Sequence, residues 1–397
     1  MHDAVIVDVI RTGSGRGKPG GALSGVHPVD LLAGVLAKLV ERNGLDPTQV
    51  DDVIAGCVSQ AGEQTFNLAR NAALAAGFPI TVPGVTIDRQ CGSSQQAAHF
   101  AAQGVIAGGY DIVIACGVES MSRVPMGSPV GGRDPFGPKM AERFAPGLVP
   151  QGISAELIAA RWGFDRDAVD GYAAESHRRA AAAAATGRFD NELVPVPITA
   201  EDGTERAHTA DETIRPATTV EGLAGLKPSF YDEATDARFG GLPWLITPGN
   251  SSPLTDGASA ALIMSERRAT ELGLRARARF VGFAVVGDDP IMMLTGPIPA
   301  THRILERTGL SLDRIDAYEV NEAFAPVPLA WAAELHADPE RLNPCGGAIA
   351  LGHPLGASGT KLLATLVNHL EATGGRYGLQ TMCEGGGMAN AMIIERL

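Results

Sequence analysis

The N-terminal third of the chain alternates between continuous apolar runs and segments whose apolar residues have helical spacing. Short continuous apolar runs are typical of strands buried on both faces of a parallel sheet. The 3.6-residue spacing predicts helices that pack one face against such a sheet. The expected strands are 4–10, 53–58, 82–87 and 110–117, and the expected helices are 28–42, 67–76 and 97–107. The pattern therefore predicts an α/β fold.

The same order of elements begins again near residue 279. The expected elements are strand 279–286, helix 300–308, strand 315–320 and helix 326–335. Segment 376–384 also resembles segment 109–117, and each follows a helix of small residues. We interpret the chain as two similar halves related by pseudo-twofold symmetry, residues 1–121 and 271–397. The return at 249–270, which contains a further strand, completes the first half.

Residues 122–248 have a different texture, with many prolines and glycines and scattered short helices. We expect them to form a loop domain inserted into the first half. Helices are expected at 155–162 and 167–185. The alanine run that ends the second helix is expected on a solvated face because alanine is a strong helix former, and His177 and His208 are expected at the surface.

Charge and cysteine usage narrow the possible classes of protein. The formal net charge of −13 argues against a nucleic-acid partner or an anionic membrane surface, because both are bound by clustered Lys and Arg. No apolar run reaches membrane-spanning length, so membrane insertion is not expected. The five cysteines include no C-x-x-C pair, so neither a disulfide framework nor a structural zinc site is expected. The chain opens on a strand pattern without a basic leader, and we expect a reducing, cytoplasmic location.

Cys91 stands at the turn between a predicted strand and a predicted helix. Free N–H groups and the dipole at a helix N-terminus favour a thiolate, so Cys91 is a candidate nucleophile. A lone cysteine is more often a buried core residue, which is how we interpret Cys116 inside its strand. The choice for Cys91 depends on whether partners for it occur elsewhere in the chain.

Three clusters in the second half could supply those partners. They are N-E-A-F at 321–324, a glycine-rich turn at 346–359 that contains His353, and C-E-G-G-G at 383–387. All lie at strand ends or helix starts, where sheet-based enzymes keep their sites. A cysteine with a histidine indicates thiolate catalysis, and a second cysteine among glycines indicates a further acid or base and an oxyanion-binding loop. No metal is expected, because zinc takes a fourth ligand and closer spacing.

These motifs resemble the signatures of a known family. D-R-Q-C-G-S-S at 88–94 precedes the three clusters in the order found in the thiolases, the acyl-CoA acetyltransferases. Arg11-Thr12, the return at 249–252 and T-G-P-I-P at 295–299 are also similar, so the resemblance spans essentially the whole chain. It implies an α/β thiolase fold, with two duplicated βαβαβαββ-type halves in a five-layer αβαβα core. The inserted loop domain would cover the coenzyme A site.

The resemblance also implies catalytic roles. Cys91 would be the nucleophile that takes the acyl group as a thioester, with its pKa lowered by His353. Cys383 would protonate the leaving enolate in thiolysis, or deprotonate acetyl-CoA in synthesis. His353 and a water held by Asn321 would stabilise the enolate oxygen. The backbone N–H groups of Cys91 and Gly385 would form a second oxyanion hole.

Further positions match the substrate-binding residues of the family. Ser252 and Phe324 match positions that line the pantetheine tunnel, and Ala323 is a further expected substrate-binding residue. Met293 matches a position near the acyl end. The resemblance implies coenzyme A as a substrate, with no permanently bound cofactor. It also implies a homodimer or a dimer of dimers, with acyl-CoA and CoA as the small-molecule partners.

One departure from the family pattern bears on the reaction. Short-chain biosynthetic members carry His-Met-Gly before Thr-Ala-Glu, where this chain has P-Q-G-I-S-A-E at 150–156, and extra residues lie around 232–244. Both features favour a degradative 3-ketoacyl-CoA thiolase with a roomier acyl pocket. Such an enzyme reversibly cleaves a 3-ketoacyl-CoA with CoA, giving acetyl-CoA or propionyl-CoA and a shortened acyl-CoA.

Three alternatives stay open. The nearest is a biosynthetic acetoacetyl-CoA thiolase, which condenses two acetyl-CoA molecules. Ketoacyl synthases resemble the same fold, but they use a second histidine where Asn321 lies and have no counterpart of Cys383. A non-catalytic acyl-CoA or lipid-binding relative would be expected to lose the reactive residues, and here all four are present.

Overall fold

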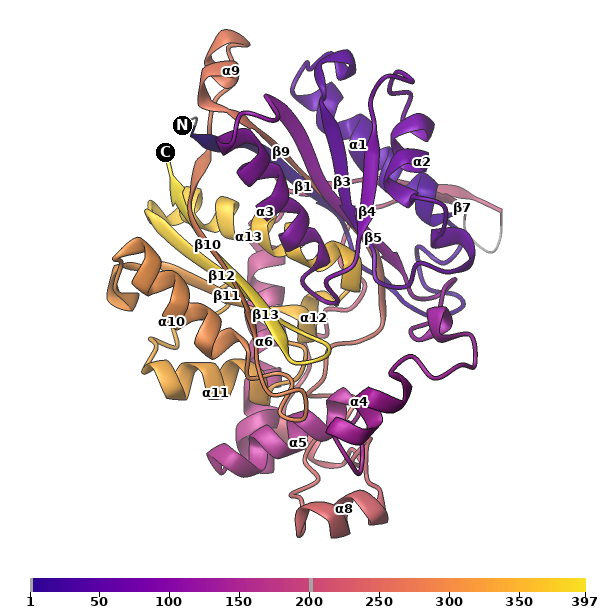
Figure 1. The fold of residues 1–397 in the computed structure, drawn as a ribbon, viewed down its shortest axis with the longest axis vertical. Coiled ribbons are helices and arrows are strands. Elements are labelled where there is room, and N and C mark those ends of the chain that lie inside the picture. The colour runs from indigo at the N-terminus through magenta and orange to yellow at the C-terminus, as the bar shows by residue number, and fades with distance from the viewer. Residues whose placement is uncertain (1–2, 200–202) are drawn as a thin grey trace.

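The computed structural model describes residues 3–199 and 203–397, and its centre is a mixed sheet of 11 strands (Figure 1). The main path through the sheet runs β11-β12-β13-β10-β1-β9-β5-β3-β4. The first half contributes β1 (Ala4–Thr12), β3 (Asp52–Gly56), β4 (Gly84–Ile87), β5 (Ile112–Ser120) and β9 (Thr255–Ser265). The second half contributes β10 (Ala278–Gly287), β11 (Ala317–Val320), β12 (Tyr377–Glu384) and β13 (Met388–Arg396). Two short strands, β2 (Gly15–Arg16) and β6 (Leu193–Val194), pair with β9 and β1.

The two halves of the sheet have the same strand order, which confirms the predicted duplication. The path β3-β5-β9-β1 corresponds to β11-β12-β13-β10, with the first pair parallel and the following pairs antiparallel in both. β4 adds a further strand at the free edge of the first half. β1 and β10 pair antiparallel over a short register, Val5 with Arg279 and Ile6 with Ala278, so the two halves join into one sheet.

Helices cover both faces of each half and produce five layers (Figure 1). One apolar core lies between the first half and its outer helices, a second around the two central helices, and a third between the second half and its outer helices. The outer helices are α1 (Pro28–Arg42) and α2 (Leu68–Ala75) on the first half, and α10 (Pro297–Thr308) and α11 (Pro326–Leu335) on the second. The central helices are α3 (Ser93–Ile106) and α13 (Ser358–Thr373).

The remaining elements lie mostly in residues 122–248. They are α4 (Gly137–Arg143), α5 (Gln151–Trp162), α6 (Arg166–Ala185), β7 (Val196–Thr199), β8 (Glu205–His208), α7 (Val220–Ala224) and α8 (Glu233–Phe239). Outside that segment are α9 (Glu266–Glu271) and α12 (Ala348–Leu351). Figure 1 shows α4, α5 and α8 gathered at one end of the molecule.

The structure corrects three expectations about single residues. His177 is buried, and its Nδ1 accepts a hydrogen bond from the Arg215 backbone N–H at 3.1 Å. His208 is buried as well, so the prediction that both histidines lie at the surface is wrong. The alanine run of α6 is not wholly solvated, because Ala180 and Ala183 pack in a core with α12. The errors at His177 and in the alanine run arise because α6 is covered by neighbouring segments that its own sequence does not indicate.

All five cysteines are free and buried, and Cys116 lies in the core as predicted. Among the described residues no helix is long and apolar enough to cross a membrane. The same part of the chain holds no group of three or more His, Cys, Asp or Glu side chains arranged to bind a metal ion.

The central helices touch backbone to backbone at their N-termini, and this contact yields a stability prediction. A Cβ at Gly359 would overlap the Gln95 backbone nitrogen. We expect Gly359→Ala to lower the free energy of unfolding by about 1–3 kcal/mol, because neither backbone can move aside without disturbing the core. Urea unfolding measures this change.

The matched control is Gly34→Ala on α1, where a Cβ would meet nothing within 4 Å. This substitution should stabilise the protein by about 0.5–1 kcal/mol, because alanine loses less backbone entropy in a helix. Equal effects at the two positions would contradict the assigned helix contact.

Candidate active site

Cys91 lies in the loop between β4 and α3, buried at 4% exposure. α3 begins at Ser93, earlier than the predicted residue 97, so Cys91 is next to the N-cap Gly92. The Ser93 hydroxyl accepts from the Arg89 backbone N–H at 2.9 Å and donates to the Gln90 carbonyl at 2.6 Å. These bonds close a tight loop that holds the thiol at the start of the helix.

His353 lies in the turn between α12 and α13, also buried. Its Nδ1 is 2.5 Å from the Ser358 hydroxyl, which itself donates to the Pro354 carbonyl at 2.9 Å. Ser358 must therefore accept from His353, and the ring proton sits on Nδ1. The Nε2 lone pair faces the Asn321 side-chain amide at 3.4 Å. His353 is thereby oriented as a proton acceptor at Nε2.

Burial keeps this cysteine and histidine uncharged at rest. Burial raises the pKa of Cys91 to about 12, and the nearby Glu384 carboxyl adds to the effect. Burial lowers the pKa of His353 to about 3, helped by the positive charge of Lys361. For the resting thiol, burial therefore outweighs the backbone hydrogen bond that lowers the pKa of Cys91, so the structure does not favour a resting thiolate. The thiolate forms only when a base takes its proton.

Cys383 is the second-last residue of β12, just before a glycine hairpin that leads to β13. The side chain is fully buried and packs with Met293, Ala323 and Phe324. Burial, followed by the nearby Cys91, raises the pKa of Cys383 well above its usual range. The two thiols therefore lie close enough to influence each other electrostatically. At the hairpin, Gly387 has a φ of +76° and a Cβ there would lie 2.8 Å from the Asp288 carbonyl oxygen, which leaves room only for glycine.

Asn321 follows the end of β11, and its neighbour Glu322 ties this strand end to the His353 turn. The Glu322 carboxyl accepts from the Ile349 backbone N–H in α12 at 3.1 Å and from the Ser176 hydroxyl at 2.7 Å. The Asn321 backbone N–H donates to the Thr381 carbonyl of β12 at 3.1 Å. Asn321 is thus fixed from both sides.

The return after residue 249 lies against this strand end. The Ser252 backbone N–H donates to the Ala323 carbonyl at 3.0 Å, and the Ala325 N–H donates to the Asn250 carbonyl at 2.9 Å. The predicted positions Ser252, Ala323 and Phe324 therefore meet, although the sequence separates them widely.

A cavity of about 450 Å³ opens beside Cys91. Phe230, from the segment 122–248, meets Phe324 edge to face with 6.0 Å between ring centroids. Cys91 and Phe324 are among the described residues that line the cavity. His353 and Cys383 are buried and are not part of its lining. Most of the lining is apolar, including Val58, Met126, Pro129, Val130, Phe230, Phe324 and Leu355.

Two buried carboxyls near the site were missed from the sequence. Glu119, at the end of β5, accepts from the Val58 and Ser59 backbone N–H groups at 2.9 and 3.0 Å and from that of Gly356 at 2.9 Å. It therefore joins loops of both halves. Glu384 packs so closely on Gly92 that a Cβ there would overlap it. An acidic residue at the end of a buried strand is the signal that could have indicated both.

Comparison with known proteins decides the family. The family model "Thiolase, N-terminal domain" matches residues 4–267, and "Thiolase, C-terminal domain" matches residues 274–396. The chain belongs to the thiolase family. Over its full length this thiolase is 48% identical to the steroid 3-ketoacyl-CoA thiolase FadA6 of Mycobacterium tuberculosis, covering 95% of that protein. It is 46% identical to a 3-ketoacyl-CoA thiolase of Vibrio vulnificus, with each chain covered completely.

A solved structure supports the same assignment for the fold. The crystal structure of the Bacillus anthracis acetyl-CoA acetyltransferase matches this thiolase with a TM-score of 0.89 and 38% sequence identity. The match covers 100% of this chain and 99% of the other. The expected thiolase fold is confirmed.

Glu384 gives this thiolase a testable pH dependence of stability. Neither carboxyl oxygen has a hydrogen-bond partner among the described residues, and burial raises the pKa of Glu384 to about 8. The unfolded chain ionises this group near pH 4.5, so folding becomes less favourable as the pH rises between these values. We expect Glu384→Gln to gain up to about 1.4 kcal/mol of stability over the wild type per pH unit in that window.

Urea unfolding at several pH values measures the gain. The exposed Glu142→Gln on α4 removes the same charge at the surface and serves as the control. Unfolding free energies for Glu384→Gln that run parallel to those of the wild type would contradict a protonated, buried Glu384.

Proposed function

We propose that this protein catalyses the reversible thiolytic cleavage of a 3-ketoacyl-CoA by CoA. The products are acetyl-CoA or propionyl-CoA and a shortened acyl-CoA, formed through an acyl-Cys91 intermediate. The observation that carries the proposal is a buried histidine whose Nδ1 proton is held by Ser358 and whose Nε2 faces Asn321, in a chain with two further buried thiols, Cys91 and Cys383. Cysteine thiolates are strong nucleophiles once a base removes the proton.

In the first half-reaction, His353 Nε2 takes the proton of Cys91 and the thiolate attacks the 3-keto carbon. The bond between C2 and C3 of the substrate then breaks, which leaves the acyl group on Cys91. The electron pair of that bond forms the enolate of acetyl-CoA, and Cys383 donates its proton to the α-carbon. The raised pKa of Cys383 means that it holds this proton until the enolate forms.

In the second half-reaction, the Cys383 thiolate takes the proton of an incoming CoA thiol. The CoA sulfur attacks the thioester carbon, and the acyl group leaves as the shortened acyl-CoA. The Cys91 thiolate then regains its proton from the His353 imidazolium. Atoms and charges balance over the cycle, and each residue returns to its uncharged resting form.

Two groups of donors would stabilise the oxyanions. Once protonated, His353 donates from Nε2, and with a water held by Asn321 it would bind the enolate oxygen. Asn321 Oδ1 has no hydrogen-bond partner among the described residues, which supports this role. The backbone N–H groups of Cys91 and Gly385 would bind the oxygen of the tetrahedral intermediate. Preorganised donors of this kind contribute several kcal/mol to catalysis.

We also propose a division of labour along the chain. Residues 1–121, completed by 249–270, and residues 271–397 form the two core halves, and 122–248 forms the loop domain that covers the coenzyme A site. Ser252, Ala323 and Phe324 would line the pantetheine arm, with Met293 near the acyl end. The contact of Phe230 with Phe324 at the cavity supports this arrangement, because Phe230 belongs to the loop domain.

The apolar cavity favours degradation of acyl chains larger than acetyl. Its lining is mostly apolar, with Ser59, Asp88, Gln90 and Gln151 as the polar side chains, which suits a fatty or ring-bearing acyl group. The names of the relatives, one of them a steroid 3-ketoacyl-CoA thiolase, point in the same direction. Biosynthetic condensation of two acetyl-CoA molecules is the second candidate, favoured by the likeness to the Bacillus anthracis acetyl-CoA acetyltransferase.

A homodimer, or a dimer of dimers, is part of the proposal. β4 is an edge strand, and Phe66 and Ile80 near it are 92% and 83% exposed. Exposed apolar side chains beside a free strand edge mark an association surface. A monomer in analytical ultracentrifugation would overturn the assembly. The five free cysteines suit a reducing compartment, so we propose a cytoplasmic location.

The activity is tested with a panel of 3-ketoacyl-CoA substrates from short linear to ring-bearing chains. Loss of the enolate absorbance on addition of CoA measures thiolysis, and we expect the larger substrates to have the higher kcat/KM. Absence of thiolysis with every substrate would contradict the proposal. Tight binding without an acyl adduct on Cys91 in mass spectrometry would instead favour the non-catalytic alternative.

Mutation should separate the roles of Cys91 and Cys383. Cys383→Ala should still form acyl-Cys91 from an acyl-CoA, because nucleophile and base are intact. Condensation should fall roughly 10²–10⁴-fold, because the proton transfer at the α-carbon is lost. Cys116→Ala removes a buried thiol from the core of the first half and should keep both steps. Loss of acylation in a folded Cys383→Ala protein would contradict the assigned roles.

A further inference from the structure

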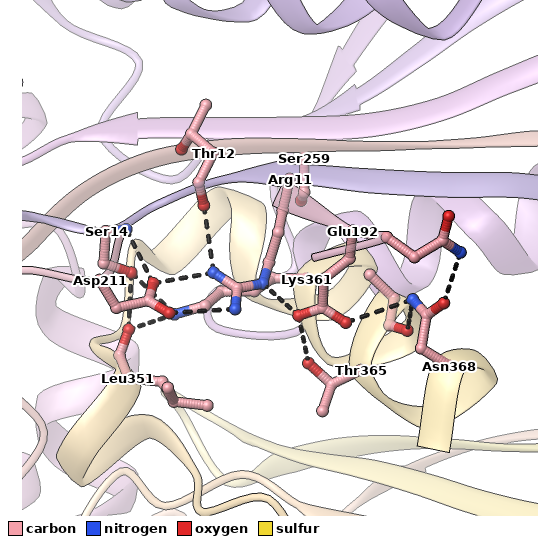
Figure 2. Close-up of polar contacts among 12 residues, drawn as sticks. Arg11, Thr12, Ser14, Glu192, Asp211, Ser259, Leu351, Lys361, Thr365 and Asn368 are labelled. Carbon is pink, nitrogen blue, oxygen red and sulfur yellow. Dashed lines mark hydrogen bonds and ion pairs between the residues drawn. The ribbon is translucent and has the colours of Figure 1, made fainter. Parts of the chain in front are cut away.

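A buried cluster of charged side chains joins all three parts of the chain (Figure 2). It lies next to the His353 turn, because Lys361 binds the Leu351 and Gly352 carbonyls. Arg11, at the end of β1, is fully buried and lies 2.6 Å from the Glu192 carboxyl. Its other nitrogens make a two-pronged contact with Asp211 at 2.8 and 3.0 Å. Lys361 on α13 completes the cluster, and its charge helps Arg11 to hold the pKa of Asp211 low despite burial.

Lys361 Nζ has three hydrogen-bond partners, and all of them are acceptors. It donates to the Ser14 hydroxyl and to the Gly352 carbonyl, each at 2.9 Å, and to the Leu351 carbonyl. The Ser14 hydroxyl donates its proton to the Leu351 carbonyl at 2.6 Å, so it can only accept from Lys361. Three acceptors require three N–H donors, which only the ammonium form provides.

Burial disfavours the positive charge of Lys361, whereas the nearby carboxylates favour it. Burial lowers the pKa of Lys361 to about 7, although Asp211 raises it. The ammonium is therefore present below neutral pH, and the three acceptors favour it further. A buried lysine without such partners would be costly, so the cluster supplies the environment that keeps a positive charge at this position.

The two carbonyls that Lys361 binds directly precede His353. Gly352 has a φ of +80°, and a Cβ there would lie 2.7 Å from Thr255 Oγ1. The same Thr255 hydroxyl accepts from the His353 backbone N–H at 3.0 Å. Lys361 thus holds the chain on one side of the histidine, and Thr255 and Ser358 hold the residue itself.

Lys361 also affects the protonation of the His353 imidazole. Its positive charge, after burial, is the second cause that keeps the pKa of His353 low. The other titratable groups at the site, Cys91, Cys383 and Glu384, have a raised pKa and are uncharged at neutral pH. Lys361 is therefore a source of positive charge that holds the imidazole neutral and ready to accept a proton.

We propose that Lys361 is a positioning residue for His353. Its ammonium group, held by the cluster of Arg11, Glu192 and Asp211, fixes the Leu351 and Gly352 carbonyls and so fixes the direction of the imidazole, whose Nε2 faces Asn321. The inference rests on the proposed function in so far as it assigns His353 a role in thiolysis, while the effect of Lys361 on the ring is a property of the fold.

The test is Lys361→Met, which keeps the length of the side chain and removes the charge and the donors. Displacement of the base by a fraction of an ångström should lower kcat roughly 10²-fold. KM should change less than about threefold, because substrate contacts are untouched. The pH at which His353 titrates, followed by NMR of labelled histidine, should move upward, and the acid limb of kcat/KM should move with it.

Two further variants separate positioning from loss of stability. Thr365→Val, one turn along α13, removes a 3.0 Å hydrogen bond to Glu192 without touching the His353 turn. It should leave kcat and the His353 titration unchanged. Lys361→Arg keeps the charge, so the titration of His353 should stay close to that of the wild type. A merely structural role would lower stability in all three variants without moving the titration in Lys361→Met.

A folded Lys361→Met protein with wild-type kcat and wild-type His353 titration would overturn the inference. If that variant does not fold, Ser14→Ala decides instead, because it removes one acceptor of Lys361 and one donor to Leu351. Unchanged kcat and an unchanged titration in Ser14→Ala would also overturn it. Failure of the proposed function is distinguishable: the wild type would lack thiolysis, while the His353 titration would still report on Lys361.

Discussion

The site depends on one close contact, made where the N-termini of α3 and α13 touch. The two helices come from different halves of the duplicated fold, and Gly359 lets their backbones meet at Gln95. The Thr360 backbone N–H donates to the Ser94 hydroxyl at 3.0 Å, which fixes the contact in register. Cys91 precedes one helix and His353 precedes the other. A single contact between backbones therefore sets the relative position of Cys91 and His353, the proposed nucleophile and base.

Burial decides the resting state of the chemistry. A buried charge is costly, so the thiol and the imidazole are both uncharged before substrate arrives, and the Glu384 carboxyl beside them holds its proton as well. In the proposed mechanism the charges arise only during turnover, when preorganised donors surround the developing oxyanion. Lys361 is the exception, because a network of buried partners supports its charge at some distance from the reacting atoms.

The sequence predicted the strands, the duplication and the motif-bearing turns because each leaves a local pattern. Continuous apolar runs indicated β1 and β5, and reactive residues among glycines indicated the turns of His353 and Cys383. The start of α3 was missed because its first turn contains polar residues, which here are buried between helices. The cluster of Arg11, Asp211 and Lys361 was also missed, because side chains far apart in the sequence leave no local signal. The roles of Ser252 and Met293 stay predictions.

The meeting of the two central helices has an electrostatic meaning as well as a steric one. Each helix carries a partial positive charge of about half a unit at its N-terminus, from the aligned peptide dipoles. In most folds such ends point to separate places, whereas here the duplication brings a pair of them to the same loops. An anion that forms between those loops lies in the field of both. The pseudo-twofold symmetry thus doubles the field at the point where the proposed mechanism forms negative charge.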